Sequence, residues 1–214
     1  EQLGLTQQLA DCLTDRRHVG YVGHTFLEMV RMRVYGILAD CADQNDHDLL
    51  RSEPVFKLLC DRSIHDDDLA SQPTLSRFEN AIDTGSFFHL RDMLIDQFIA
   101  SFDEPPQRLT LDVDPFDDPT YGQRPGTQQI PCAGCPLTFF HGYYRQYQYL
   151  PRVITCAEND LVLSLCLLYG SAHPALGADE DLEYVVRRLR EAWPEVEIHL
   201  RGDSGFGVPA MYDI

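Results

Sequence analysis

The stretch RLTLDVDP, residues 108–115, alternates apolar and polar positions. This period of two is typical of a half-buried strand, so the apolar residues share one face and Asp112 and Asp114 share the other. A carboxylate beside a sheet core costs free energy unless it is paired or binds a metal ion. The pattern therefore leaves two alternatives, a solvated edge strand or a carboxylate-based metal site.

The chain before this strand, from about Leu5 to Phe102, has a helical pattern. The segment HTFLEMVRMRVYGILADCA predicts a helix whose apolar stripe consists of Phe26, Leu27, Val30, Val34, Ile37 and Leu38. A second amphipathic run, SFFHLRDMLIDQFIASF, ends before DEPP at 103–106, where two prolines favour a linker. We therefore expect a helical domain over 1–106 and a second domain over 107–214.

Between these helices, DLASQPTLSRFENAI predicts a short helix that Ser71 caps and that holds Pro73 in its first turn. Its apolar side consists of Leu75, Phe78 and Ile82, and its polar side of Gln72, Thr74, Ser76 and Arg77. Such a polar side fits a recognition helix that reads DNA in the major groove through Gln72, Thr74 and Arg77. The alternative is an ordinary capped helix in a bundle, which the acidic neighbour HDDDLA favours.

After residue 106 the pattern changes to strands. The segments GYYRQYQYLPRVITCA and LVLSLCLLYG flank a turn at Glu158–Asp160 and predict a hairpin. The segment DEDLEYVVRRLREAWP then predicts a helix, whose apolar stripe consists of Leu182, Val185, Val186, Leu189 and Trp193. The segment EVEIHLRG after it predicts a strand, whose core-facing residues are Val196, Ile198 and Leu200. This β-β-β-α-β order allows the last strand to lie parallel beside the first, through a right-handed crossover, which would bring Asp203 near Asp114.

Two carboxylates on adjacent strands can hold divalent cations for phosphoryl transfer, and Mg²⁺ suits such oxygen ligands. Small residues in the following stretch, GDSGFG, would let a phosphate approach the backbone closely. The alternative for GDSGFG is a strand-to-helix turn in which Asp203 or Ser204 acts as a cap. His173, in GSAHPALGA, is most simply a turn residue.

Composition narrows the function classes. With 44% hydrophobic residues among 214, the chain has the composition of a globular protein, and no apolar run approaches the roughly 20 residues that span a bilayer. The N-terminus lacks the pattern of a secretory signal, so we expect a cytoplasmic protein without membrane insertion. The formal charge of −17 argues against a broad basic face that binds nucleic acid. Apart from a single lysine, Lys57, the lysine and arginine side chains are all arginines, whose guanidinium groups are suited to phosphate contacts and remain compatible with DNA binding.

The seven cysteines are odd in number and lack a framework spacing, as expected of reduced thiols in a cytosol. Cys132 and Cys135, in PCAGCP, have a spacing that could chelate zinc, with His141 as a nearby candidate partner. No second such pair follows, so the alternative is a loop with two free thiols.

Four segments, LDVDPFDDPTYG, HGYYRQYQYLP, GSAHPALGAD and LRGDSGFGVPAMYD, occur in the order and approximate spacing of DDE-type transposases of prokaryotic insertion sequences. The chain resembles the group called DDE domain group 1, and DLLRSEPVFKLL and LASQPTLSRFEN look like that family too. The resemblance implies an α+β protein in which a helical N-terminal region for DNA binding and assembly, residues 1–106, precedes a partial ribonuclease-H-like catalytic domain, residues 107–214. By position in their motifs, Asp114 matches the first catalytic acid and Asp203 the second, with Asp112 as the fallback for the first.

The resemblance also implies double-stranded DNA as partner, at transposon ends and target, Mg²⁺ or Mn²⁺ as cofactor, a homo-oligomer in the complete form, and association with the nucleoid when bound to DNA. The family's third acid, a glutamate on a later helix, has no match before Ile214. We therefore expect the N-terminal part of a transposase, inactive alone because of truncation. The alternatives are a DNA-binding or subunit-sequestering regulator and, less favoured, a hydrolytic nuclease.

Overall fold

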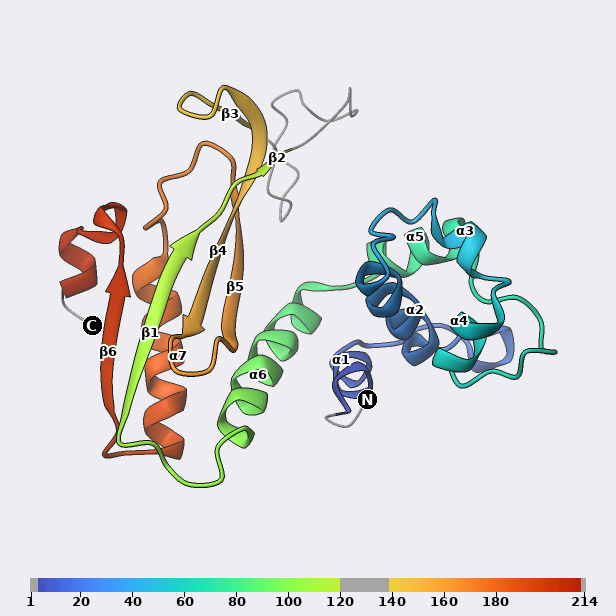
Figure 1. The fold of residues 1–214 in the computed structure, drawn as a ribbon, viewed down its shortest axis with the longest axis horizontal. Coiled ribbons are helices and arrows are strands. Elements are labelled where there is room, and N and C mark those ends of the chain that lie inside the picture. The colour runs from blue at the N-terminus through green and yellow to red at the C-terminus, as the bar shows by residue number, and fades with distance from the viewer. Residues whose placement is uncertain (1–3, 120–138, 213–214) are drawn as a thin grey trace. The chain divides into compact units, whose positions relative to one another are not determined.

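The computed structural model describes residues 4–119 and 139–212, and shows an α+β protein whose N-terminal helices precede a mixed sheet (Figure 1). The chain divides into two compact units, residues 1–93 and 94–214. The division falls inside helix α6 (Thr84–Ala100), and not at the prolines near 106, because Ile95 and Phe98 of this helix pack into the core of the second unit. The assignment of DNA binding and assembly to residues 1–106, and of catalysis to 107–214, stays a prediction.

The N-terminal unit is a small helical bundle. Its helices are α1 (Leu5–Asp11), α2 (Phe26–Leu38), α3 (His47–Leu50), α4 (Pro54–Leu59) and α5 (Gln72–Asn80), with a 3-10 turn at Val19–Tyr21. Its buried apolar residues are Ala10, Met29, Val30, Met32, Cys60, Leu69, Ala70, Leu75 and Phe78. This core joins residues from α1, α2 and α5, so the short helices are stabilised by shared burial.

The apolar stripe expected along α2 is partly wrong. Ile37 and Leu38 are 53% and 77% exposed, whereas Met29 and Met32 are buried. Apolar residues surround this helix on most sides, so their spacing alone does not select the buried face. The start of the helix is well defined, because Thr25 Oγ1 accepts a hydrogen bond of 3.1 Å from the backbone N–H of Glu28.

Helix α5 has the predicted apolar side, with Leu75 and Phe78 buried. Ser71 is at the N-cap position, but its hydroxyl contacts Thr74 Oγ1 at 3.1 Å and accepts no backbone hydrogen bond. Proline lies in the first turn, as expected. The helix therefore has its predicted place and core side, and differs in how its first turn is capped.

The second unit contains the sheet. Its strands are β1 (Arg108–Pro115), β2 (Asp118–Pro119), β3 (Phe139–His141), β4 (Gln146–Cys156), β5 (Val162–Tyr169) and β6 (Glu197–Gly202), and helix α7 (Ala178–Ala192) joins β5 to β6. Strand β4 pairs antiparallel with both β1 and β5, and β6 pairs parallel with β1. The short strands β2 and β3 also pair with β4. The long strands and α7 confirm the predicted β-β-β-α-β order.

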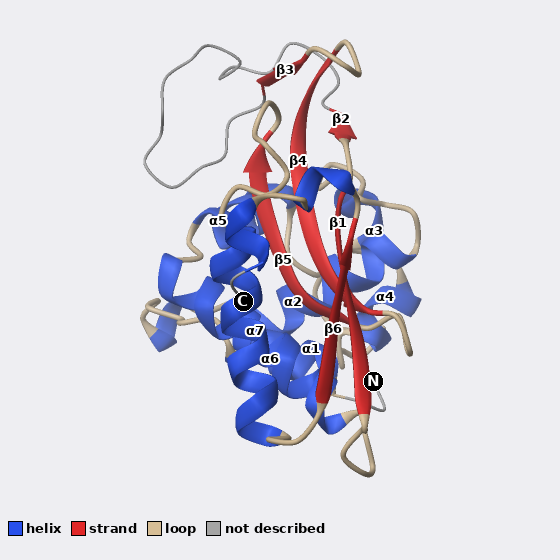
Figure 2. Ribbon diagram, turned by 90° about the vertical axis from the view of Figure 1, so that its left-hand side faces the viewer, coloured by secondary structure: helices blue, strands red, loops and turns tan. Residues whose placement is uncertain are grey.

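Helices cover one face of this sheet. In Figures 1 and 2, α7 lies against the face that also meets α6. The shared core includes Leu111 and Val113 of β1, Ile95 and Phe98 of α6, and the predicted stripe of α7. On the opposite face β5 exposes Leu165, Leu167 and Tyr169. Among the described helices, none has the length and apolarity needed to cross a membrane.

Strand β6 lies at one edge of the sheet in the described residues. Val196 before it is buried and Ile198 packs against the core, as expected, but Leu200 is 38% exposed. Two 3-10 turns follow, at Ser204–Phe206 and Pro209–Tyr212, and Phe206 returns into the core. The chain after β6 is thereby tied back to the sheet, which fixes the backbone around Asp203.

Candidate active site at the ends of β1 and β6

The candidate site lies where β1 and β6 end side by side. Their parallel register pairs Asp112 with Arg201 and Val113 with Gly202, so the next position along the two strands holds Asp114 and Asp203. A pocket of about 280 Å³ at this edge is lined by Asp112, Val113, Asp114, Arg201, Gly202 and Asp203. The structure thus brings the two predicted acids to one site.

The alternation of β1 determines which side chains reach this site. Leu111 and Val113 are buried in the core, while Asp112 and Asp114 lie on the opposite face, as their spacing predicts. Because parallel strands in register direct paired side chains to the same face, Arg201 meets Asp112 there. Both carboxylates therefore lie on the face that α6 and α7 leave open.

Asp112 is the ion-pair partner of Arg201. The guanidinium donates two hydrogen bonds of 2.5 Å from Nε and Nη2 to the two carboxylate oxygens of Asp112. This bidentate arrangement occupies the carboxylate that would otherwise be the fallback for the first acid. It leaves Asp114 as the acid of β1 that faces Asp203, as the motif position implies.

The carboxyl group of Asp114 is destabilised in its charged form. Partial burial, the charge of Asp203 and the charge of Asp112, in that order, raise the pKa of Asp114 above its ordinary value. Two like charges held together by the backbone favour a bound proton or a cation. This electrostatic arrangement is typical of a cation-binding site.

Asp203 is held by the turn that follows β6. Its Oδ1 accepts a hydrogen bond of 2.7 Å from the backbone N–H of Gly205, so the side chain caps the 3-10 turn Ser204–Phe206. The capping alternative for GDSGFG is therefore correct for one oxygen of Asp203. This capping role is compatible with a role of Asp203 in the candidate site, because the hydrogen bond from Gly205 orients the carboxylate at the end of β6.

A buried arginine supports the neighbouring loop. Arg152 of β4, 2% exposed, donates to the backbone carbonyls of Pro174, Leu176 and Gly177 and to the carboxylate of Asp181. These contacts hold the segment GSAHPALGA, where His173 accepts from the N–H of Ala175 as a turn residue does. Sequence reasoning missed Arg152, although an arginine inside the apolar run YLPRVITC was a sign of a buried polar contact.

The donor set fits part of a metal site. Asp114 and Asp203 supply carboxylate oxygens, the ligands that Mg²⁺ prefers. Across residues 4–119 and 139–212, however, no group of three or more histidine, cysteine, aspartate or glutamate side chains is arranged to hold a metal ion. The described residues thus provide two carboxylates, and further ligands would be water, DNA or a group beyond these ranges.

The candidate DNA-binding residues divide into two sets. Arg77 is exposed and its Nη2 donates to Thr74 Oγ1 at 3.2 Å, so these two lie together. Gln72 is half-buried and points elsewhere, because its Nε2 contacts Gln44 Oε1 at 3.4 Å. The role of Gln72, Thr74 and Arg77 in binding DNA stays a prediction.

The proposed zinc pair, Cys132 and Cys135, lies outside the described residues. Burial raises the pKa of the Cys60 thiol to about 12 and, with the nearby Glu158, that of Cys156 to about 11. Thiols that hold their protons so firmly are poor nucleophiles and poor metal ligands at neutral pH.

Comparison with known families identifies the class of protein. The family described as "Transposase DDE domain group 1" matches residues 1–214, and the chain therefore belongs to this transposase family. DDE transposases use divalent metal ions, in agreement with the carboxylate pair at the ends of β1 and β6.

Among solved structures, the chain is similar to one titled "Mos1 transposase paired-end complex with left transposon end". The identity is 14% and the TM-score 0.30, over 94% of this chain and 58% of that one. The chain thus spans less than two thirds of the length of this solved relative. A sequence search found no match among curated proteins.

Proposed function

We propose that this chain provides two of the catalytic acids of a transposase that cuts and joins transposon-end DNA by two-metal phosphoryl transfer. The observation that carries the proposal is the parallel pairing of β1 with β6, which ends at Val113 and Gly202, one residue before Asp114 and Asp203. The raised pKa of Asp114 supports the proposal. Among the described residues, no cationic side chain offsets the charge of Asp203 beside Asp114 in the way that Arg201 offsets Asp112.

Each residue of the site has a distinct task in this proposal. Asp114 and Asp203 bind the metal ions, and the bond from Gly205 orients Asp203. Arg201 neutralises Asp112 and so limits the negative charge that incoming phosphate meets. A divalent cation, Mg²⁺ with Mn²⁺ as a substitute, would activate water or a 3′-hydroxyl and stabilise the charge on phosphate oxygens.

The site needs a third carboxylate for a fully determined metal geometry, and the described residues do not supply one beside Asp114 and Asp203. In our proposal it comes from outside these residues or from another subunit of a homo-oligomer. The same observation favours a second candidate function. Alone, the chain would be a regulator that binds DNA or sequesters subunits of a complete insertion-sequence transposase without catalysis.

Double-stranded DNA, at the transposon ends and at the target, is the proposed partner. Support comes from family membership and from the exposed Arg77 on α5. In a chain of net charge −17, we expect such contacts to be local, because this charge argues against a broad basic face that attracts phosphate.

Titration with Mn²⁺, followed by electron paramagnetic resonance of the free ion, tests the metal site. We expect the full chain to bind Mn²⁺, and Asp114→Asn and Asp203→Asn each to weaken binding about tenfold or more. Asp160→Asn is the matched control, because Asp160 lies in the β4–β5 turn at φ 57°, a conformation that asparagine also adopts. Equal affinity in all four proteins would refute the site.

A further inference from the structure

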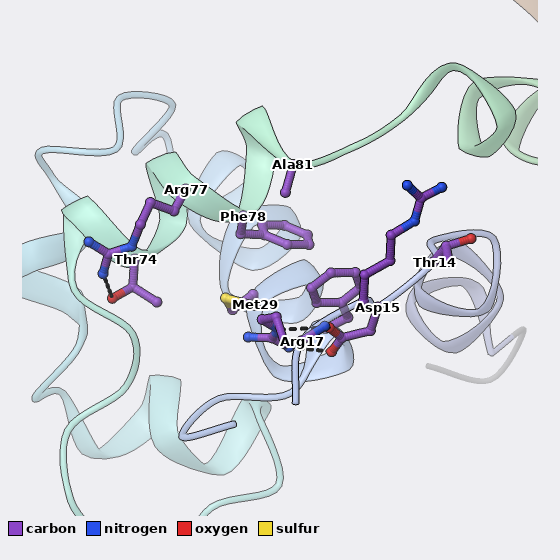
Figure 3. Close-up of a pocket in the computed structure, with 10 residues that line it drawn as sticks. Thr14, Asp15, Arg17, Met29, Thr74, Arg77, Phe78 and Ala81 are labelled. Carbon is purple, nitrogen blue, oxygen red and sulfur yellow. Dashed lines mark hydrogen bonds and ion pairs between the residues drawn. The ribbon is translucent and has the colours of Figure 1, made fainter. Parts of the chain in front are cut away.

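A second pocket, of about 430 Å³, opens in the N-terminal unit between residues 14–17, α2 and α5 (Figure 3). This volume is in the range of small-ligand sites. All of its lining residues belong to the unit that precedes the catalytic acids. The pocket therefore shares no lining residue with the β1–β6 site, and it includes Thr74 and Arg77 of α5.

The pocket has an aromatic and apolar wall. Phe26 and Phe78 meet edge to face, with ring centroids 5.0 Å apart, and Met29 lies below the Phe78 ring in the view of Figure 3. Phe78 and Met29 are almost completely buried. Such walls favour a flat, apolar group, because aromatic faces stack on other rings and a polar group would lose its hydration there.

Three guanidinium groups line the pocket against one carboxylate, that of Asp15. Arg17 is fixed, because it forms a bidentate pair with Asp15, donates to the carbonyl of His24 and lies 4.6 Å from the Phe26 ring centroid. Arg16 pairs with Asp83 at 2.7 Å. These two arginines therefore have counter-ions in the protein.

Arg77 differs from them. Within the described part of the N-terminal unit, every other arginine has a carboxylate oxygen within 4.0 Å, namely Arg16, Arg17, Arg31, Arg33, Arg51, Arg62 and Arg91. Arg77 has only the hydroxyl of Thr74, which accepts one of its hydrogen bonds (Figure 3). A guanidinium without a counter-ion, in a chain so rich in carboxylates, is suited to an external anion that presents two adjacent oxygens to its two parallel N–H donors, such as phosphate.

We propose that this pocket binds one unpaired nucleotide of DNA, with its base against the Phe26–Phe78 wall and its phosphate on Arg77. The combination selects the ligand, since the wall fits a planar ring and the arginine fits the anion joined to it. A base inside a duplex is stacked between its neighbours and does not offer its face, so the nucleotide is one outside the helix, at a nick, a bulge or a strand end. The inference rests on the proposed DNA function and adds to it a site for an extrahelical base.

Fluorescence anisotropy with the full chain and three labelled duplexes of one sequence tests this proposal. The first duplex is perfect, the second carries one extra unpaired adenosine, and the third carries an abasic residue at that position. We expect the unpaired base to improve binding about tenfold over the abasic duplex. Arg77→Ala and Phe26→Leu should each remove most of this difference, and Arg77→Lys should keep part of it because it keeps the charge without the planar fork.

Arg187→Ala is the control, because it removes the same charge from an exposed position on α7, in the other unit, and should leave the preference intact. Circular dichroism melting checks that each variant is folded.

If the wild-type chain binds base-bulged and abasic duplexes equally, the pocket proposal is overturned while the DNA function stands. If it binds none of the DNAs, both are overturned. Binding of an acidic aromatic peptide, lost in Arg77→Ala, with no effect of the unpaired base, would assign the pocket to a protein partner and refute the nucleotide.

Discussion

At the scale of single residues, the candidate active site depends on an imbalance between three neighbouring carboxylates. Asp112 has a bidentate partner in Arg201, while Asp114 experiences the charges of both Asp203 and Asp112. The structure therefore separates an aspartate with a structural partner from one whose charge is uncompensated. Burial and like charge together raise the pKa of Asp114 and so favour its protonated form. A bound cation would favour the ionised form instead.

The first prediction concerns this pKa. Asp203→Asn removes one negative charge, so the pKa of Asp114 should fall towards its ordinary value without reaching it, because partial burial and Asp112 remain. In the wild type the folded chain holds the extra proton between the ordinary and the raised pKa, so this group's contribution to stability falls as pH rises through that window. Carboxyl ¹³C NMR titration measures the shift. An unchanged pKa for Asp114 would mean that the two side chains do not face each other.

The second prediction concerns Glu158 in the β4–β5 turn. Burial opposes its charge, but hydrogen bonds from the Thr110 N–H, at 3.0 Å, and from the Cys156 thiol lower the pKa of Glu158 to about 2. Its stabilisation is therefore present above the unfolded pKa near 4.5 and is lost as pH falls towards 2. Since the residue is exposed, we expect Glu158→Ala to cost only about 1 kcal/mol at neutral pH.

Urea unfolding of wild type and Glu158→Ala across this pH range measures the effect. The difference in the free energy of unfolding should shrink as the solution becomes more acidic. Asp160→Asn, in the same turn, removes a carboxylate charge that caps nothing on β1 while keeping a residue that tolerates the positive φ, and is the control. A difference that stays constant with pH would show that the lost interaction does not depend on the ionised carboxylate.

At the scale of secondary-structure elements, Arg152 joins β4 to the loop before α7 and to the first turn of that helix. Its guanidinium satisfies three carbonyls and Asp181 in a buried position. Pro174 of the same loop lies close to Gly205, beside the turn that holds Asp203. The contact thus helps to fix the surroundings of the second acid.

The third prediction is that Arg152→Leu lowers the free energy of unfolding by about 3 kcal/mol, because it leaves buried carbonyls and Asp181 without their partner. Arg187→Leu, on the exposed face of α7, should change it by less than about 0.5 kcal/mol. Urea denaturation followed by the fluorescence of Trp193, which lies in this unit's core, measures both. A loss equally small in the two variants would show that the loop does not depend on Arg152.

The elements also show how far the sequence could predict the fold. The strand alternation of 108–115 and the stripe of α7 each have one apolar face, so period alone identified the buried side. Helix α2 is apolar on most sides, and its buried face is chosen by contacts with α1, α4 and α5 that no local pattern contains. The partners of Arg152 are backbone carbonyls more than 20 residues away, and such carbonyls have no sequence signature.

For the candidate site, the predicted β-β-β-α-β order was sufficient to place Asp114 beside Asp203. It was not sufficient to predict the pairing of Asp112 with Arg201.

At the scale of the whole molecule, the negative charge of −17 and the pairing of most described arginines with carboxylates limit how the chain could meet DNA in the proposed function. In that proposal, association with DNA relies on a few local contacts, such as Arg77, and on metal ions at the carboxylate pair. In the part of the chain that the structure describes, the edge of β6 that faces away from β1 has no strand partner, and β5 exposes leucines. Both surfaces favour contact with further protein, since unpaired strand edges and exposed apolar residues promote association.

The fourth prediction is that the 214-residue chain by itself shows little or no strand transfer on a transposon end with Mg²⁺ or Mn²⁺. The two acids that the described residues bring together leave the metal geometry under-determined, and small misplacements are costly in phosphoryl chemistry. A joining assay with labelled transposon-end DNA measures this. Robust joining, abolished by Asp114→Ala or Asp203→Ala, would contradict the prediction and show that a carboxylate not identified here, or one from another subunit, completes the site.

The most direct test of the central claim is a crystal structure of this chain soaked with Mn²⁺, with the metal located by its anomalous scattering. The account predicts a peak in contact with the carboxylates of both Asp114 and Asp203, on the sheet face opposite α6 and α7, and no peak there in Asp114→Asn. Carboxylates on opposite faces of the sheet, or more than roughly 10 Å apart with Mn²⁺ bound elsewhere, would contradict it, because two-metal catalysis requires ligands that share the ions.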